Sequence, residues 1–253
     1  MIKSQRQSEI LKLLENTNTL LVADLAELLN CSMMTIRRDI EEMESKSLVK
    51  KVFGGVELYG EKDIEPNFKK RVARHIEEKR RIAEEAVKYI EKGSVVFVDA
   101  GSTPLQVVRI IPVGLKFTAI TNCIMTAAEL CTKPNITVIM LGGEVHHSAY
   151  ATVNNIAINT AKKFKTDLAL ISTHAVILPE GLFENTLSLI EIKRALVDNA
   201  KEVFLLADHS KFNEQAMCLS IPITDIDHVI TDKETPTDKI EGLRNQGLKI
   251  TQV

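Results

Sequence analysis

The sequence predicts an α/β protein with two parts, a small N-terminal unit of helices and a hairpin and a larger unit built on an open parallel sheet. The small unit is indicated by three helix-like segments followed, within the first 58 residues, by an alternating segment that contains two glycines. The larger unit is indicated from Gly93 onward, where short apolar runs alternate with helix-like segments, as is typical of parallel strands joined by crossovers. We therefore divide the chain into residues 1–58, a linker over 59–76 and an α/β unit over 77–253.

The first 58 residues contain the signals of three helices and a hairpin. Apolar side chains recur at helical spacing in three segments, which are residues 5–16, 22–29 and 32–46. Ser32 is a suitable N-cap for the third helix, and residues 48–58 alternate in polarity around Gly54-Gly55, which predicts a β-hairpin. Three short helices followed by a hairpin are the plan of a winged helix-turn-helix.

The third helix is the candidate for DNA contact, because the second helix of a helix-turn-helix enters the major groove with its N-terminal residues against base edges. If Ile36, Ile40 and Met43 face the core, the opposite side of the helix is open to a ligand. Arg38 is placed to reach a base edge, whereas Arg37 suits the phosphate backbone. The residues predicted to contact DNA are Ser32, Met34, Thr35, Arg37, Arg38, Lys50 and Lys51. A solvated charged face or a purely protein-binding winged helix is the alternative.

Six apolar runs in the second half of the chain are short enough to be buried strands. They are residues 95–98, 117–120, 136–141, 168–171, 203–207 and 228–230. The helix-like segments among them are residues 77–90, 104–111, 123–133, 152–164 and 187–200. This alternation predicts a Rossmann-like open α/β sheet with helices on both faces.

Small and polar residues follow several of these strands. The turn from Asp99 to Thr103 leads into a helix, where backbone N–H groups and hydroxyls can hold an anion. Because ligands of open parallel sheets bind outside the carboxyl ends of the strands, we expect these turns to converge. Asp99 and Asn122 suit sugar hydroxyls, and Lys211 supplies a positive charge for a phosphate. The residues predicted for this site are Asp99, Gly101, Ser102, Thr103, Thr121, Asn122, Gly142, Gly143 and Lys211.

Composition is that of an ordinary globular protein, with 45% hydrophobic and 26% charged residues. The formal net charge is −2, so DNA binding has to depend on where the charges lie rather than on their sum. No apolar run reaches the roughly 20 residues of a membrane span and no secretory signal is visible, so we expect a cytoplasmic protein without a membrane partner. The four cysteines include no C-x-x-C pair, and we expect no metal and no cofactor.

Several strings together resemble one known family. The pattern Arg6-x3-Ile10-x3-Leu14, followed later by Ser32-x-x-Thr35-Ile36-Arg37-Arg38-Asp39-Ile40, resembles the DNA-binding signature of the DeoR family of bacterial sugar-metabolism repressors. The resemblance continues in Glu65-Pro66-x-Phe68-x-x-Arg71, in Val98-Asp99-x-Gly101-Ser102-Thr103 and in Asp208-His209-Ser210-Lys211-Phe212. It covers nearly the whole chain and is looser between residues 144 and 200.

The resemblance implies a transcriptional repressor of a carbohydrate-utilisation operon that binds double-stranded operator DNA and responds to a phosphorylated sugar. It also implies an effector domain similar in fold to ribose-5-phosphate isomerase and CoA transferases. We expect a homo-oligomer, a dimer or a tetramer, which sets the separation of two DNA-binding helices.

The chain departs from the family pattern in two places. The wing reads Phe53-Gly54-Gly55 where the family usually has His-Gly-Gly. Residues 170–175 lack the glycines that family members commonly have, so the effector pocket is expected to be reshaped there. Thr173 lies in this altered segment and is added to the predicted effector site.

Two other functions remain open from the sequence. The first is an enzyme, a sugar-phosphate isomerase or CoA transferase with a helical appendage. We expect no catalytic residues, because Thr173 and His174 stand where the related isomerases keep carboxylates, and a proton shuttle needs a positioned acid and base. The second is a constitutive DNA-binding protein whose α/β domain only oligomerises.

Overall fold

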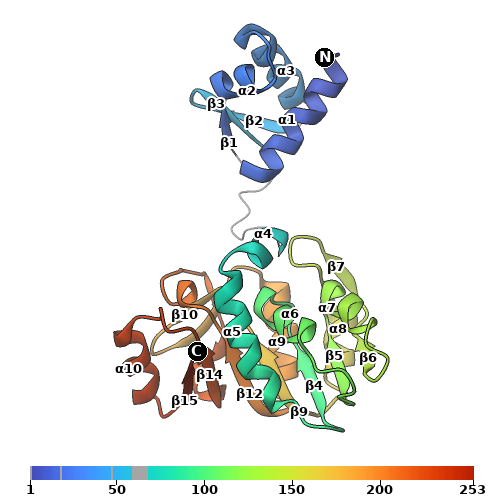
Figure 1. Cartoon of the computed structure of the whole chain (residues 1–253), viewed down its shortest axis with the longest axis vertical. Coiled ribbons are helices and arrows are strands. Elements are labelled where there is room, and N and C mark those ends of the chain that lie inside the picture. Colours follow the sequence, from blue (N-terminus) through green and yellow to red (C-terminus); the bar gives the residue numbers. More distant parts are fainter. Residues whose placement is uncertain (1, 18, 47, 59–67) are drawn as a thin grey trace. The chain divides into compact units, whose positions relative to one another are not determined.

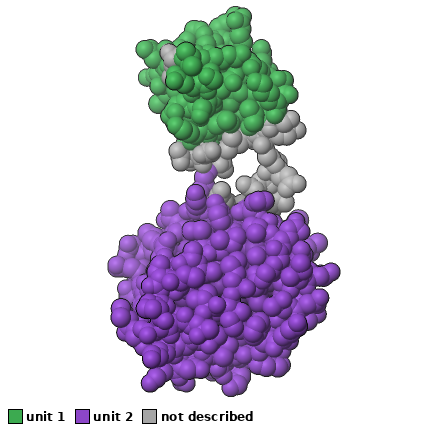
Figure 2. Space-filling view, turned by 90° about the vertical axis from the view of Figure 1, so that its right-hand side faces the viewer, with its two compact units in different colours: residues 1–64 green, residues 65–253 purple. Residues whose placement is uncertain are grey.

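The computed structural model describes residues 2–17, 19–46, 48–58 and 68–253. It divides into two compact units, residues 1–64 and 65–253, which are coloured separately in Figure 2 and described here one at a time. The first half of the segment predicted as a linker, residues 59–67, lies outside the described residues. Residues 68–76 of that predicted linker are helical for the most part, since they form a short helix and the start of the next one.

Unit 1 is a winged helix. Its elements are α1 (Lys3–Thr17), β1 (Thr19–Leu21), α2 (Val22–Leu28), α3 (Met33–Ser45), β2 (Val49–Val52) and β3 (Gly55–Leu58). The three helices and the hairpin confirm the sequence prediction, and Ile36, Ile40 and Met43 are buried in a core shared with α1, α2 and the wing.

The three-residue strand β1 was not predicted, because it is too short to show a pattern. It pairs with β3, which stands between β1 and β2 in an antiparallel sheet. A Cβ atom at Gly55 would lie 2.5 Å from the carbonyl oxygen of Leu20, so glycine is required where β1 passes the wing. Gly54 has a φ of +74° and forms the turn of the hairpin.

Unit 2 is built on a seven-stranded parallel sheet in the order β15-β14-β12-β9-β4-β5-β6 (Figure 1). Its strands are β4 (Val95–Val98), β5 (Thr118–Thr121), β6 (Thr137–Met140), β9 (Thr166–Ile171), β12 (Ala200–Leu206), β14 (His228–Thr231) and β15 (Lys249–Gln252). The six predicted apolar runs are the first six of these. The edge strand β15 was not predicted, since it is partly exposed and lacks a continuous apolar run.

Helices cover both faces of the sheet, as expected. One face packs against α5 (Ile76–Ala86), α6 (Ser102–Arg109) and α7 (Ile124–Leu130). The other packs against α8 (Asn154–Ala161), α9 (Leu187–Val197) and α10 (Thr237–Asn245). The remaining helical segments are α4 (Phe68–Ala73) and the single turns η1 (Val87–Tyr89), η2 (His209–Phe212) and η3 (Ile223–Asp225). Within the described residues, no helix combines the length and the apolar character that crossing a bilayer requires.

Two small antiparallel sheets were not predicted from the sequence. One joins β10 (Ala175–Ile177), β11 (Gly181–Glu184) and β13 (Cys218–Pro222), and the other joins β7 (Glu144–His146) and β8 (Ala151–Val153). Their strands are three to five residues long and interrupt the βα alternation. The first of these sheets contributes a residue to the site described below.

Candidate DNA-binding helix and effector cleft

The N-terminal turn of α3 is exposed. Ser32 is its N-cap: the Ser32 Oγ accepts a hydrogen bond from the Thr35 N–H at 3.2 Å and lies 2.9 Å from the Thr35 hydroxyl. Met34, Arg37 and Arg38 are exposed, and Thr35 is half-buried. In the part of the chain that the structure describes, neither arginine forms an ion pair, so both guanidinium groups are available to a ligand.

The wing lysines are exposed but already paired with carboxylates. Lys50 lies 3.3 Å from Glu57 on the neighbouring strand. Lys51 lies 3.2 Å from Glu44 and 3.8 Å from Glu41, both on α3. The backbone N–H of Lys51 also donates to Glu44 at 2.9 Å, and this hydrogen bond is the main reason that the pKa of Glu44 is lowered. The contacts of Lys51 attach the wing to α3, whereas the Lys50–Glu57 pair lies within the wing.

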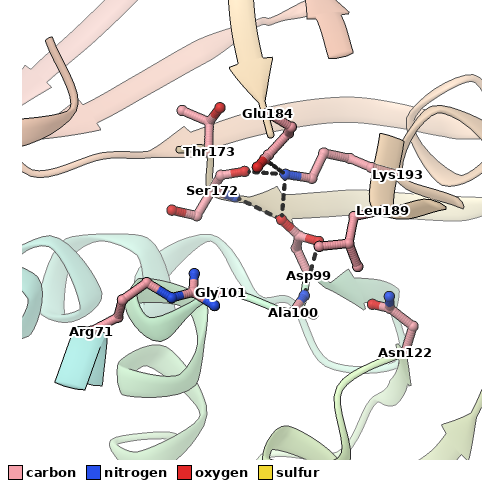
Figure 3. A pocket seen from close by; sticks show the side chains of 10 residues that line it. All are labelled: Arg71, Asp99, Ala100, Gly101, Asn122, Ser172, Thr173, Glu184, Leu189 and Lys193. Carbon is pink, nitrogen blue, oxygen red and sulfur yellow. Dashed lines mark hydrogen bonds and ion pairs between the residues drawn. The ribbon is translucent and has the colours of Figure 1, made fainter. Parts of the chain in front are cut away.

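A second candidate site lies in unit 2, where β4 and β9 are neighbours (Figure 3). The chain runs outward from β4 to β6, returns to β9 beside β4, and then runs outward again to β15. In open α/β sheets, ligands bind outside the carboxyl ends of the strands at such a switch point. The cleft there is lined by Arg71, Asp99, Ala100, Gly101, Asn122, Ser172, Thr173, Glu184, Leu189 and Lys193.

Lys193 forms the charged centre of this cleft. Its ammonium group lies 3.2 Å from Asp99, forms an ion pair with Glu184 and donates to the carbonyl oxygen of Ser172 at 2.6 Å. All three charged side chains are nearly removed from water. Burial by itself lowers the pKa of Lys193, but the two carboxylates outweigh this effect and raise it. The two acids therefore favour the charged form of Lys193, which is bound to both of them.

Asp99 is fixed by the backbone on either side of the switch point. One carboxylate oxygen accepts from the Ala100 N–H at 2.8 Å, and the other accepts from the Ser172 N–H at 3.1 Å. The carboxylate thus joins the turn after β4 to the turn after β9.

Gly101 and Asn122 give the cleft its capacity for a ligand. Gly101 is the N-cap of α6, and a Cβ atom there would lie 2.7 Å from Pro104 Cδ and 2.9 Å from Ser172 Cβ. The Asn122 side chain donates to the carbonyl oxygen of Thr152 at 3.3 Å, but its own Oδ1, which is buried, has no hydrogen-bond partner. The cleft therefore offers the backbone N–H groups of a helix start together with an unsatisfied acceptor.

Two domain profiles of known proteins match this chain, one in each unit. A profile described as "DeoR-like helix-turn-helix domain" matches residues 6–62, and one described as "DeoR C terminal sensor domain" matches residues 74–233. The second match alone spans more than half of the chain. The chain belongs to the DeoR family. It is a helix-turn-helix transcriptional regulator whose α/β unit is the sensor domain of that family.

Curated relatives of this DeoR-family regulator match along their whole length. The HTH-type transcriptional regulator GolR of Listeria innocua is 30% identical over 99% of this chain and 98% of its own. The glycerol-3-phosphate regulon repressor of Escherichia coli is 27% identical over 99% of both chains. Among solved structures, ribose 5-phosphate isomerase A of Methanocaldococcus jannaschii is 19% identical, covers 53% of each chain and has a TM-score of 0.40, which carries no functional argument.

Of the residues predicted for the effector site, Asp99, Gly101, Asn122 and Thr173 line the cleft. Ser102 and Thr103 lie beside it, in the first turn of α6, and both are buried. The other predicted residues do not line it: Thr121, Gly142, Gly143 and Lys211. Thr121 instead donates its hydroxyl to the carbonyl oxygen of Val98 at 2.7 Å.

Gly142, Gly143 and Lys211 follow strands that lie one strand beyond those whose ends line the cleft. The two glycines follow β6, which is separated from β4 by β5, and a Cβ atom at Gly143 would lie 2.4 Å from the carbonyl oxygen of Val153. Close packing against Val153 therefore explains why residue 143 is a glycine. Lys211 lies on η2 after β12, on the far side of β9, where its charge helps to lower the pKa of Lys79.

Sequence reasoning missed six residues of the cleft, which are Arg71, Ala100, Ser172, Glu184, Leu189 and Lys193. Glu184 enters from β11 of the unpredicted small sheet and Lys193 from the buried face of α9. The available signal was a lysine among the apolar positions of α9, since a buried lysine requires a partner. Asp99, which was predicted for the site, and Glu184, which was not, bring two carboxylates together at Lys193.

Proposed function

We propose that this regulator represses a carbohydrate-utilisation operon, that α3 binds its operator, and that a phosphorylated sugar in the cleft of unit 2 changes operator affinity. As part of this proposal the chain acts in the cytoplasm as a homo-oligomer, a dimer or tetramer that spaces two α3 helices to match half-sites about 34 Å apart. The names of relatives support it, among them a glycerol-3-phosphate regulon repressor and a putative aga operon repressor.

The DNA half of the proposal is supported by the exposed first turn of α3. The Ser32 and Thr35 hydroxyls are assigned to phosphate contacts, and Arg38 is assigned to a base edge, where a bidentate bond to guanine gives about 1–3 kcal/mol of discrimination. Arg37 is assigned to the phosphate backbone. Met34, Lys50 and Lys51 complete the proposed contact surface.

The effector half is supported by one observation above others: the cleft at the switch point has buried hydrogen-bonding capacity that the chain does not use. The Oδ1 of Asn122, which lines the cleft, is buried and unsatisfied, and so is the Oγ1 of Thr103 in the first turn of α6 beside it. Unsatisfied buried polar atoms of this kind cost about 1–3 kcal/mol each, which a polar ligand would recover. Asp99, Gly101, Ser102 and Thr173 complete the proposed contacts to the effector.

Binding rather than catalysis is proposed for this cleft. A general base must be free to accept a proton, but Asp99 and Glu184 are each held by the ammonium group of Lys193. An isomerase or CoA transferase remains the second candidate, because two carboxylates and a lysine meet there. Turnover of pentose and hexose phosphates by the purified chain would favour it.

The proposal is tested by operator binding in the presence of sugar phosphates. Fluorescence anisotropy with duplexes from upstream of the chain's own gene should reveal one sequence bound at least 1000-fold more tightly than random DNA. One sugar phosphate should then change this affinity by roughly 5- to 150-fold and raise the melting temperature of unit 2. Operator binding that no sugar phosphate alters would instead indicate a constitutive DNA-binding protein.

A further inference from the structure

The cleft is too small for a sugar phosphate as it stands. Its cavity measures about 20 Å³, which is room for about one water molecule. A wall of the cleft must therefore move or a side chain must swing out when the effector enters. Three of its walls are strand ends of the main sheet, the start of α6, and β11 with α9, all of which are held by hydrogen bonds or buried ion pairs.

The fourth wall is α4, which carries Arg71 into the cleft (Figure 3). α4 has six residues, too few to be stable without its neighbours. It is also the first element of unit 2 to follow residues 59–67, through which the chain continues from the wing of unit 1.

We infer that Arg71 binds the phosphate group of the effector, and that this contact couples the cleft to α4. The inference rests on the proposed function. It deepens that function by assigning the anion to a residue that the sequence analysis had not placed in the cleft, instead of to Lys211. It makes α4 the element whose position depends on the ligand.

The charges in the cleft support the assignment of Arg71 as the residue that binds the phosphate group. Lys193 is bound by two carboxylates, so this cluster carries a net negative charge and by itself would repel a phosphate. Arg71 is the other cation among the residues that line the cleft. Its guanidinium group lies 5.4 Å from the Phe68 ring centroid and reaches toward the turn at Gly101, where α6 begins (Figure 3). An arginine beside a helix N-terminus is a suitable combination for phosphate.

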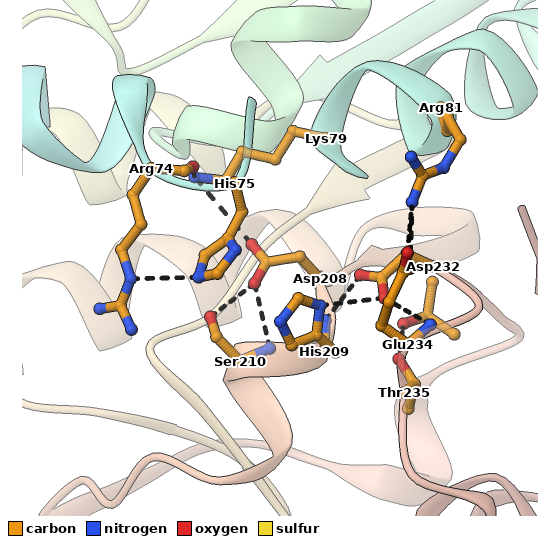
Figure 4. A network of polar contacts seen from close by, with 11 residues as sticks. Arg74, His75, Lys79, Arg81, Asp208, His209, Ser210, Asp232, Glu234 and Thr235 are labelled. Carbon is orange, nitrogen blue, oxygen red and sulfur yellow. Dashed lines mark hydrogen bonds and ion pairs between the residues drawn. The ribbon is translucent and has the colours of Figure 1, made fainter. Parts of the chain in front are cut away.

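Contacts with the rest of unit 2 hold both ends of α4. At the start of the helix, Phe68 is buried against Leu105 and Cys123, and its N–H donates to the carbonyl oxygen of Ser148 at 3.2 Å. At the end of the helix, the Lys79 ammonium group donates to the carbonyl oxygen of Arg71 at 2.5 Å and to that of Arg74 at 2.6 Å. Figure 4 shows Lys79 beside Arg74.

Lys79 is itself buried and lies 4.0 Å from Asp208. The carboxylate of Asp208 in turn accepts hydrogen bonds from the Ser210 N–H and hydroxyl (Figure 4). α4 is thus held at its two ends by the core of unit 2, while the Arg71 side chain extends to the cleft. A phosphate bridging Arg71 and the start of α6 would add a third attachment.

The test compares Arg71→Gln with Lys69→Gln in the full chain. Lys69 is on the same helix but is exposed and does not line the cleft, so it controls for loss of charge from α4. Melting temperature is measured with inorganic phosphate and with pentose and hexose phosphates, each beside its unphosphorylated sugar. We expect Arg71→Gln to weaken the binding of phosphorylated ligands roughly 10- to 100-fold. We expect Lys69→Gln to bind these ligands as tightly as the wild-type chain does. Arg71→Lys should restore part of the loss.

Amide hydrogen exchange over residues 68–76 provides the second measurement. Ligand should slow exchange there in the wild-type chain and in Lys69→Gln, but not in Arg71→Gln. Wild-type affinity in Arg71→Gln, or equal protection of α4 in all three proteins, would overturn the inference and leave the proposed function intact. A wild-type chain that responds to no phosphorylated ligand would overturn both.

Discussion

Arg6 on α1 and Asp39 on α3 form a two-pronged ion pair inside the winged helix. Both the Nε and the Nη2 of Arg6 donate to the carboxylate, the latter at 3.2 Å, and the side chains are only 11% and 2% exposed. The hydrogen bond to Asp39 is the main reason that the pKa of Arg6 is raised. Because Asp39 follows Arg38 directly in α3, the pair fixes the rotation of the helix that turns Arg38 outward.

Breaking this pair should destabilise unit 1 and leave unit 2 intact. Asp39→Asn leaves a mostly buried guanidinium group without its counter-charge, and we expect a loss of about 2–4 kcal/mol in the free energy of unfolding. Urea unfolding followed by circular dichroism should show an earlier transition for unit 1 only. The double variant Arg6→Met/Asp39→Leu should recover most of the loss. A single variant as stable as wild type would mean that packing alone orients α3.

Glu41 is predicted to restrain DNA binding. It is exposed on α3 and lies 3.8 Å from the Lys51 ammonium group, so it adds negative charge to the proposed DNA surface and competes with phosphates for the lysine. Glu41→Gln should tighten binding to random duplex DNA roughly three- to tenfold at low salt, with a smaller gain as salt is raised. Glu9→Gln on α1, which pairs only with Lys12 at 3.2 Å among the described residues, serves as the control. Equal effects of the two changes would indicate bulk charge alone.

The sequence predicts best those features that repeat along the chain. The buried side of α3 and the six apolar strands are set by local periodicity, which survives in the structure because nothing overrides it. The rule that ligands bind at carboxyl strand ends also placed Asp99 and Asn122 at the cleft, since β5 is the immediate neighbour of β4.

Residues brought in by tertiary contacts were not predictable in this way. Lys211 and Gly142 also follow strands, but the rule does not say which strands are adjacent. They follow β12 and β6, each of which lies one strand beyond those whose ends line the cleft. Glu184 and Arg71 come from β11 and α4, elements outside the βα alternation, so no periodic signal marks them. Lys193 is hidden because a lysine in a helix is ordinarily exposed.

Gly101 and Gly142 were both predicted for the effector site, and the structure distinguishes between them. A Cβ atom at Gly101 would meet Pro104 Cδ at 2.7 Å, whereas one at Gly142 would meet only Ile156 Cγ2 at 3.9 Å. Gly101→Ala should therefore destabilise unit 2 by about 1–3 kcal/mol and weaken effector binding. Gly142→Ala should change neither. The thermal midpoint with and without sugar phosphate measures both effects, and a selective loss of ligand in Gly142→Ala would restore the original assignment.

His228 makes the stability of unit 2 depend on pH. Its ring packs against Tyr89 and Phe204 and lies 2.8 Å from the Thr251 hydroxyl. Burial, assisted by the charge of Lys249, lowers its pKa from 6.5 to about 4. Between these values the unfolded chain binds a proton that the folded chain does not, so this residue's contribution to stability falls as pH decreases from 6.5 toward 4.

Between pH 7 and pH 4, His228 is expected to lower the free energy of unfolding by up to about 3 kcal/mol, in addition to the effect of other titrating groups. His228→Phe keeps an aromatic ring against Tyr89 and removes the titration, so its unfolding free energy should depend less steeply on pH, even if losing the Thr251 contact lowers stability at pH 7. Urea unfolding of both proteins at pH 7, 6, 5 and 4.5 measures the difference in slope. Parallel curves would mean that His228 is protonated in the folded chain as readily as in the unfolded one.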